Sequence, residues 1–303
     1  MKISKITLSL ASLLLFVVVW TGCGDASKED ATEKVNLDVA VDEGKGMLNK
    51  MNKAKNVLFM IPSPLETLSL LKKAGAEYHG DILNDPNNAS RYETARKQAL
   101  NLGIYGADLS YASLFDQTQE ATFFVKSAKS LAEGLGIMKA FDEKMFARIE
   151  ENINEQDSMM HIIADSYWTA NAYLKENEKE NTSALIIIGG WLEGLHIATH
   201  IAAEIDNNAG VVKRIAEQKY SIDNLMGLIS AYEQDSDIDY VMNDLKSIKA
   251  LYDNLEVVIE AGETSTDNNG ITVIGGMREV KISDEQLAEI SAKVEEIRTK
   301  YIE

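Results

Sequence analysis

The sequence predicts a mainly α-helical protein: a helical bundle or helical-repeat array of about eight helices, followed by a short β-hairpin and a final helix. Three observations support this fold class. No proline follows Pro86, and the chain beyond it is rich in Ala, Leu, Glu and Lys, which are good helix formers. Apolar residues recur at helical spacing behind Ser, Thr and Asp residues that can cap a helix. An apolar content of 45% is enough to build a core.

Composition excludes several classes of protein. The 48 acidic and 30 basic side chains give a net charge of −18, and no basic cluster is present that could neutralise a phosphate backbone, so nucleic acid is not an expected partner. The chain has one cysteine, which excludes an internal disulfide framework and a Cys-rich zinc module. The expected product is a soluble, acidic, globular domain.

The N-terminus has the three parts of a secretory signal over residues 1–22. Lys2 and Lys5 precede an apolar run of 15 residues, Ile6–Trp20, and small residues follow it. A membrane-spanning helix needs about 20 residues, so a cleaved signal is preferred over a permanent anchor.

Cys23 lies where a bacterial lipoprotein signal places the lipidated residue, directly after small Thr21 and Gly22. We therefore expect lipid on Cys23 and attachment to a membrane through it. Ordinary cleavage, with Cys23 as a free thiol, is the alternative. Residues 23–45 are expected to form a flexible acidic tether, and the expected location is the outer membrane of the cell envelope, facing either the surface or the periplasm.

Residues 46–262 are expected to form the helical domain. An extended buried segment is expected at 57–61, before Pro62 and Pro64, and capping boxes are expected at Ser63–Glu66 and Ser90–Glu93. The predicted helices lie near 64–79, 90–115, 119–134, 140–154, 158–176, 184–206, 209–232 and 238–261.

The helical domain has a weak internal similarity. Gly103–Ala112 aligns with Gly189–Ala198 at an offset of 86 residues, and the order of helix lengths also matches. This favours two duplicated four-helix sets, residues 62–155 and 156–262, in which Gly103 corresponds to Gly189 and Tyr105 to Trp191.

Residues 263–303 change in character. A loop rich in Gly, Ser, Thr, Asp and Asn precedes two short strands at 271–274 and 279–282, which flank Gly275 and Gly276 as a hairpin. Ser283 then opens a last helix whose apolar stripe is formed by Leu287, Ile290, Val294 and Ile297. This segment is expected to pack on the bundle, because an isolated hairpin is marginal in water.

Two predicted helices carry one isolated acid each in an apolar surrounding. Asp108 is the only formal charge between Lys97 and Asp116, and Glu193 is the only one between Glu180 and Glu204. A buried carboxylate needs a partner. One interpretation is an interior ligand site formed by Asp108, Tyr105 and Trp191. The preferred one is that each carboxylate is satisfied locally or reaches solvent.

Glu193, His196, His200 and Glu204 are spaced by three, four and four residues, which places them on one stripe of a helix. Carboxylate and imidazole at this spacing suit zinc or iron, and His161 could contribute from the preceding helix. Di-iron bundles need a second Glu-x-x-His motif, which this sequence lacks. A polar strip on a half-buried helix is therefore preferred, with a divalent metal as the alternative.

Residues 61–137 resemble an uncharacterised family of helical lipoproteins from Bacteroidota. The resemblance lies in Ile61-Pro62-Ser63-Pro64, in Leu100–Leu109 and in Gln117-Thr118-Gln119. It implies a helical fold and an envelope location, and it implies no residue roles.

No catalytic residues are predicted, because the sequence has no phosphate-binding loop and no nucleophile elbow. The expected function is that of a non-enzymatic lipoprotein that acts as a scaffold or binds a protein or small molecule, and no cofactor is expected. The alternative is a metal-binding or metal-dependent protein that uses the Glu193 stripe.

Overall fold

Helices make up most of the protein, as the sequence predicts. The computed structural model describes residues 64–141, 143–206, 208–230, 235–266 and 272–303. Its α-helices are α2 (Pro64–Lys73), α3 (Ala95–Leu114), α4 (Thr118–Gly134), α5 (Glu143–Glu151), α6 (Gln156–Glu176), α7 (Glu180–Ala202), α8 (Ala209–Ile229), α9 (Ser236–Asp253) and α10 (Asp284–Ile302). Short 3-10 turns lie at Gly80–Ile82, Pro86–Arg91 and Met138–Ala140, and strands β1 (Glu256–Thr266) and β2 (Thr272–Lys281) precede α10.

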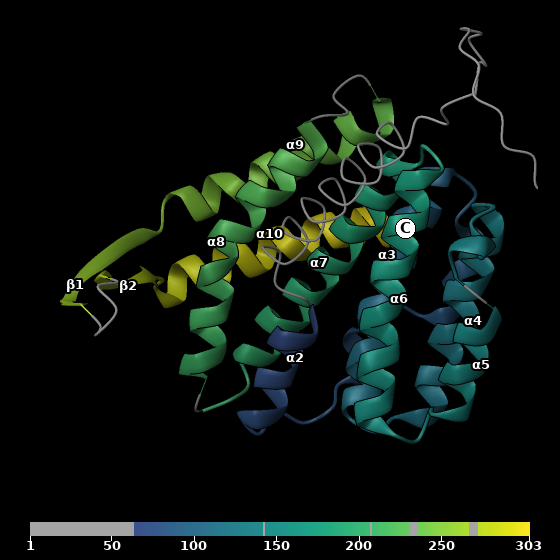
Figure 1. The fold of residues 1–303 in the computed structure, drawn as a ribbon, viewed down its shortest axis with the longest axis horizontal. Coiled ribbons are helices and arrows are strands. Elements are labelled where there is room, and N and C mark those ends of the chain that lie inside the picture. Colours follow the sequence, from purple (N-terminus) through teal and green to yellow (C-terminus); the bar gives the residue numbers. More distant parts are fainter. Residues whose placement is uncertain (1–63, 142, 207, 231–234, 267–271) are drawn as a thin grey trace, which may run out of the picture. The chain divides into compact units, whose positions relative to one another are not determined.

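Two glycines set the close crossing of α3 and α7 at the centre of the bundle (Figure 1). A Cβ atom added at Gly103 would lie 2.0 Å from the carbonyl oxygen of Ile186, and one added at Gly189 would lie 2.0 Å from that of Leu100. No side chain larger than hydrogen fits at either place. This close approach offsets the roughly 1 kcal/mol by which glycine disfavours a helix interior.

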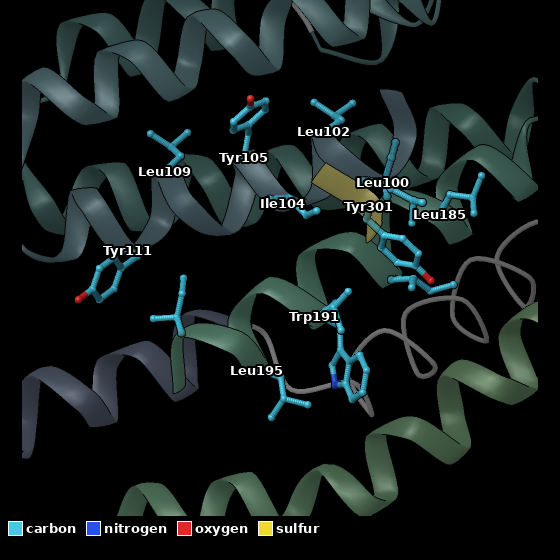
Figure 2. Packing of buried hydrophobic residues seen from close by; sticks show 14 of the residues in the cluster. Leu100, Leu102, Ile104, Tyr105, Leu109, Tyr111, Leu185, Trp191, Leu195 and Tyr301 are labelled. Atoms are coloured by element: carbon cyan, nitrogen blue, oxygen red, sulfur yellow. The ribbon is translucent and has the colours of Figure 1, made fainter. Parts of the chain in front are cut away.

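Both central helices are buried on almost every side, because their sequences are apolar around the whole helix. Figure 2 shows their side chains among the packed residues of the core. Within the described part of the chain, α7 is the one helix long and apolar enough to cross a membrane, but 89% of its most apolar stretch is buried inside the protein. Such burial is typical of the core helix of a globular domain.

The helices around this pair contact its two members in a matching way. α4 packs on α3 and α8 packs on α7, and α2 contacts α7 while α6 contacts α3. In Figure 1, α4 and α5 lie on one side of the central pair and α8 and α9 on the other. The crossing matches too, because Gly103 of α3 faces the backbone of α7 and Gly189 of α7 faces the backbone of α3. This pattern is what an internal duplication would produce, and the duplication itself stays a prediction.

The start of α3 differs from the predicted one. The capping box at Ser90 is wrong, because Pro86–Arg91 forms a 3-10 turn in which the Ser90 hydroxyl donates to the carbonyl of Asn87. α3 begins four residues later, where the Thr94 side chain accepts a hydrogen bond from the Lys97 N–H. Both segments offer a Ser or Thr with a suitable following turn, so local sequence alone did not separate them.

The C-terminal hairpin is present, but its arms are not the predicted ones. Residues 272–281 form a single strand that includes Gly275 and Gly276 and pairs antiparallel with β1, with Val257 opposite Val280 and Ala261 opposite Gly276. β1 covers residues predicted as the end of a helix and the start of a loop. The apolar run Val257–Ile259 is compatible with either structure, and a register shift between Ala261 and Thr264 accommodates the glycine-rich part.

Several predictions concern residues outside those described: the signal at 1–22, Cys23, the tether at 23–45, the segment 57–61 and the capping of α2 at Ser63. The predicted start of the last helix at Ser283 is confirmed, and the structure shows a capping box there. Ser283 accepts from the Gln286 N–H and the Gln286 side chain accepts from the Ser283 N–H.

Candidate functional site

The charge of Glu193 is balanced by an arginine that the sequence analysis did not single out. Glu193 is 0% exposed on α7, and Arg298 of α10 donates from Nε to Oε2 at 2.7 Å and from Nη2 to Oε1 at 2.9 Å. Burial alone would raise the pKa of Glu193, but the Arg298 charge and hydrogen bonds hold it below its usual value. Glu193 is therefore an ionised carboxylate in a two-pronged ion pair.

Asp108 of α3 shares this interior and has the opposite protonation behaviour. It is also 0% exposed, and its Oδ2 lies 3.4 Å from the backbone N–H of Asn84. Burial raises the pKa of Asp108 well above its usual range, and the nearby charge of Glu193 raises it further. A protonated Asp108 adds no second negative charge, so the guanidinium of Arg298 balances the one carboxylate that remains. Oδ1 of Asp108 has no hydrogen-bond partner among the described residues.

His196 lies one turn after Glu193 and is 2% exposed. Its Nε2 is 3.0 Å from the carbonyl oxygen of Ile82, and its Nδ1 is 2.8 Å from Oε2 of Glu295 on α10. A carbonyl oxygen only accepts, so Nε2 carries a proton. Burial lowers the pKa of His196, and the Arg298 charge lowers it further, against opposing contributions from Glu193, Ile82 and Glu295. In the neutral ring, Nδ1 presents a lone pair to the Glu295 carboxylate.

The contacts between α7 and α10 follow one rule. The partner of Glu193 is Arg298, and the partner of His196, three residues later, is Glu295, three residues earlier. The residue numbers rise along α7 while those of the partners fall along α10, as expected for two antiparallel helices that pack side by side. We call Asp108, Glu193, His196, Glu295 and Arg298 the ionic cluster.

The end of α10 is held by buried polar groups of α3 and the turn before it. The Asn101 side chain donates to the carbonyl of Tyr301 at 2.9 Å, and the Tyr92 hydroxyl donates to that of Ile302 at 3.2 Å. Helix ends leave carbonyl groups without intrahelical partners, so these bonds fix α10 along its axis. That position in turn aligns Arg298 with Glu193.

The five candidate metal ligands, four on the predicted stripe and His161 on α6, are not brought together as one set. Glu193 is bonded to Arg298, and Glu204 forms an ion pair with His79 at 2.9 Å on the half-exposed end of α7. His161 is exposed on α6. His196 and His200 do lie together, with ring centroids 4.7 Å apart, and Glu295 joins them from α10.

The predicted interior ligand site of Asp108, Tyr105 and Trp191 is likewise divided. Figure 2 shows Tyr105 and Trp191 pointing away from one another on the two central helices. The Tyr105 hydroxyl donates to the carbonyl of Asp85 at 2.8 Å, and the Trp191 indole donates to the side chain of Gln218 at 2.9 Å. Both aromatic residues therefore have their polar atoms satisfied by neighbouring elements.

An apolar cavity of about 70 Å³ lies away from these charges, between α3, α4, α5, α6 and α7. Its wall is formed mostly by aliphatic and aromatic side chains, including Leu102, Leu109, Phe146, Ile149, Ile163 and Ile186. The few polar groups there are largely paired: Ser183 donates to Asn171 at 2.6 Å, and the Tyr167 hydroxyl donates to the carbonyl of Gly103. The cavity suits an uncharged, apolar occupant.

Sequence analysis missed two parts of these sites. Arg298 was not predicted as a site residue, although it follows Val294 of the predicted apolar stripe by four residues and so lies beside that stripe. That spacing was the available signal. The cavity had none, because unfilled volume depends on how five helices pack. No protein-family model, curated protein or solved structure matches this chain.

Proposed function

We propose that this chain is a non-enzymatic lipoprotein of the outer membrane, anchored through lipid on Cys23, that binds a small apolar molecule in its helical domain. The observation that carries the binding function is the apolar cavity between α3, α4, α5, α6 and α7. The signal-like residues 1–22, the position of Cys23 and the resemblance to lipoproteins of Bacteroidota support the location.

The chemistry of the wall defines the class of ligand. A cavity lined by aliphatic and aromatic groups favours an acyl chain or aromatic ring over water or a charged molecule. Phe141 and Met145 line the cavity and are half-buried, so its margin includes side chains that reach solvent. Methionine and aromatic side chains at such a margin can adjust to ligands of different shape.

The ionic cluster supports a non-enzymatic function. Groups with shifted pKa values often mark active sites, but Asp108 and Glu193 are enclosed and hydrogen-bonded within the protein. Neither lines the apolar cavity. Burial explains the raised pKa of Asp108, and the ion pair with Arg298 explains the lowered pKa of Glu193, so neither shift requires a catalytic role.

Binding of N-phenyl-1-naphthylamine, an uncharged fluorescent probe, tests the proposed ligand class. We expect the probe to gain fluorescence on the wild-type protein and to lose it in Ala170→Leu, which places three further carbon atoms in the cavity wall. Ala250→Leu makes the same change at an exposed position on α9 and is the matched control. Equal fluorescence in all three proteins would refute the cavity as the binding site.

The anchor is tested separately by Cys23→Ser. We expect this variant to leave the membrane fraction, because the only cysteine of the chain would be gone. Retention at the wild-type level would refute lipidation at this position, and it would leave the probe result unaffected.

A further inference from the structure

We infer that His196, His200 and Glu295 form a binding site for a divalent first-row transition metal, with zinc as the reference ion. The donor atoms of the three side chains all lie within 4.8 Å of one another. They come from two helices, since the histidines are one turn apart on α7 and the carboxylate is on α10. The site is separate from the apolar cavity and does not depend on the proposed ligand.

The first observation is that two hydrogen-bond acceptor atoms face one another. Nδ1 of His196 lies 2.8 Å from Oε2 of Glu295, while Nε2 of the same ring already donates to the carbonyl of Ile82. Each of the two facing atoms offers a lone pair in the neutral ring and the ionised carboxylate. Such a pair needs a cation between or beside it, either a proton or a metal ion.

The second observation favours a metal over a proton. Nδ1 of His200 is buried, and among the described residues it has no hydrogen-bond partner. A proton shared by His196 and Glu295 leaves this nitrogen unsatisfied, which costs free energy in a buried place. A metal ion bound by both imidazoles and the carboxylate satisfies all three groups.

The surrounding groups resemble the outer partners of known metal sites. A metal-bound histidine usually donates its other ring N–H to a carbonyl or carboxylate, which fixes the orientation of the ring. His196 does this with Ile82. Histidines four residues apart on a helix present their rings on one face, which is a common arrangement for zinc.

The site needs only a small adjustment to reach metal geometry. Tetrahedral zinc with bonds of about 2.0–2.1 Å places its ligand atoms about 3.3 Å apart. Glu295 is 44% exposed and can move to that separation, while buried His196 stays in place. Two imidazoles disfavour magnesium and calcium, which prefer oxygen ligands. Three protein ligands leave a position for water or another ligand.

The local charge also permits a cation. Arg298 lies close to His196, but its charge is taken up by both oxygens of Glu193. Glu295 then supplies one negative charge to the ion itself. Glu193 thus acts as an outer group that neutralises Arg298, and it contributes no ligand atom.

Zinc titration of the full-length, metal-stripped protein without a polyhistidine tag tests this site. We expect one zinc ion per chain by calorimetry at pH 7.5, and binding at least roughly tenfold weaker in His200→Ala and in Glu295→Gln. His161→Ala removes an exposed histidine on α6 and is the matched control, with wild-type affinity expected.

Cobalt absorption provides a readout that does not depend on the stability of a variant. We expect visible bands of four-coordinate Co²⁺ on the wild-type protein and their loss in Glu295→Gln, whose half-exposed side chain tolerates the change. Absence of stoichiometric zinc binding, or equal weakening in His161→Ala, would overturn the site and leave a proton as the only cation between His196 and Glu295.

Discussion

The two sides of the α3–α7 pair solve the problem of burial in opposite ways. Toward α10, the ionic cluster places charged groups in the interior, where Arg298 pairs with both oxygens of Glu193 and His196 faces Glu295 at 2.8 Å. Toward α5 and α6, the apolar cavity has few polar groups that need a partner, but its volume is incompletely filled. The stability of the first side depends on which polar atoms are present, whereas that of the second depends mainly on the volume of its side chains. We therefore expect substitutions to be severe on the first side and tolerated on the second.

The largest expected effect is that of Glu193→Gln, which leaves buried Arg298 without its hydrogen-bonded counter-ion. Removal of one partner of a buried ion pair destabilises a protein by about 3–5 kcal/mol. Chemical denaturation monitored by circular dichroism would measure this loss. The double variant Glu193→Leu with Arg298→Leu should recover most of it, because no unpaired charge remains. A double variant no more stable than the single one would show that packing, rather than charge, dominates there.

The second effect concerns the crossing that divides the two regions. Gly189→Ala places a Cβ atom 2.0 Å from the Leu100 carbonyl oxygen and must separate the central helices, so we expect a loss of about 3 kcal/mol. Gly227→Ala is the control, because nothing lies within 4 Å of the added atom on α8 and alanine favours a helix by about 0.5–1 kcal/mol. Thermal unfolding of both variants gives the comparison, and a harmless Gly189→Ala would contradict the close crossing.

The third effect is a dependence on pH. The pKa of Asp108 is raised in the folded protein above its ordinary 3.8, so the folded state retains a proton that the unfolded chain releases. The contribution of Asp108 to stability is complete below about pH 4 and declines as the pH rises toward the folded-state value. Glu193, with a lowered pKa, behaves oppositely: its contribution is present above pH 4.5 and is lost in acid.

Asp108→Asn removes the first of these two dependences. The amide does not titrate, so we expect the stability of this variant relative to the wild type to rise between pH 4 and pH 8. Denaturation midpoints across this range would measure the gain. A constant difference between the two proteins would mean that Asp108 does not keep its proton on folding.

The smallest expected effect tests an ion pair outside the ionic cluster. His79 and Glu204 are 2.9 Å apart but are 31% and 52% exposed. Exposed pairs contribute about 0–1 kcal/mol, so His79→Ala should lower the free energy of unfolding by less than about 1 kcal/mol in thermal denaturation. A loss comparable to that of Glu193→Gln would remove the distinction between the two kinds of pair.

Predictability from sequence follows the same division. The isolated charges Asp108 and Glu193 indicated their burial, because they interrupt helices that are otherwise apolar. The capping box at Ser283 was also readable, since it involves residues three apart. These signals are local, and the mainly α fold follows from many of them together.

Features that depend on contacts between residues far apart in the sequence could not be predicted from such local signals. Arg298 meets Glu193 across 105 residues, and its own neighbours suggest a solvated helix. The arms of the hairpin were misplaced because Val257–Ile259 suits a strand or a buried helix equally well, and pairing with β2 decided the matter. The cavity arises where five helices fail to fill space, which no single segment encodes.

The position of α10 in the chain has a consequence for the timing of folding. Its residues are made after every other helix described here, yet Tyr301 is joined to Asn101 across 200 positions and Ile302 to Tyr92 across 210. Closing such long loops is entropically unfavourable until the final contacts form, which slows folding. Until residue 298 has emerged from the ribosome, Glu193 lacks the counter-ion that it has in the folded protein. Completion of the ionic cluster is thereby coupled to the synthesis of α10.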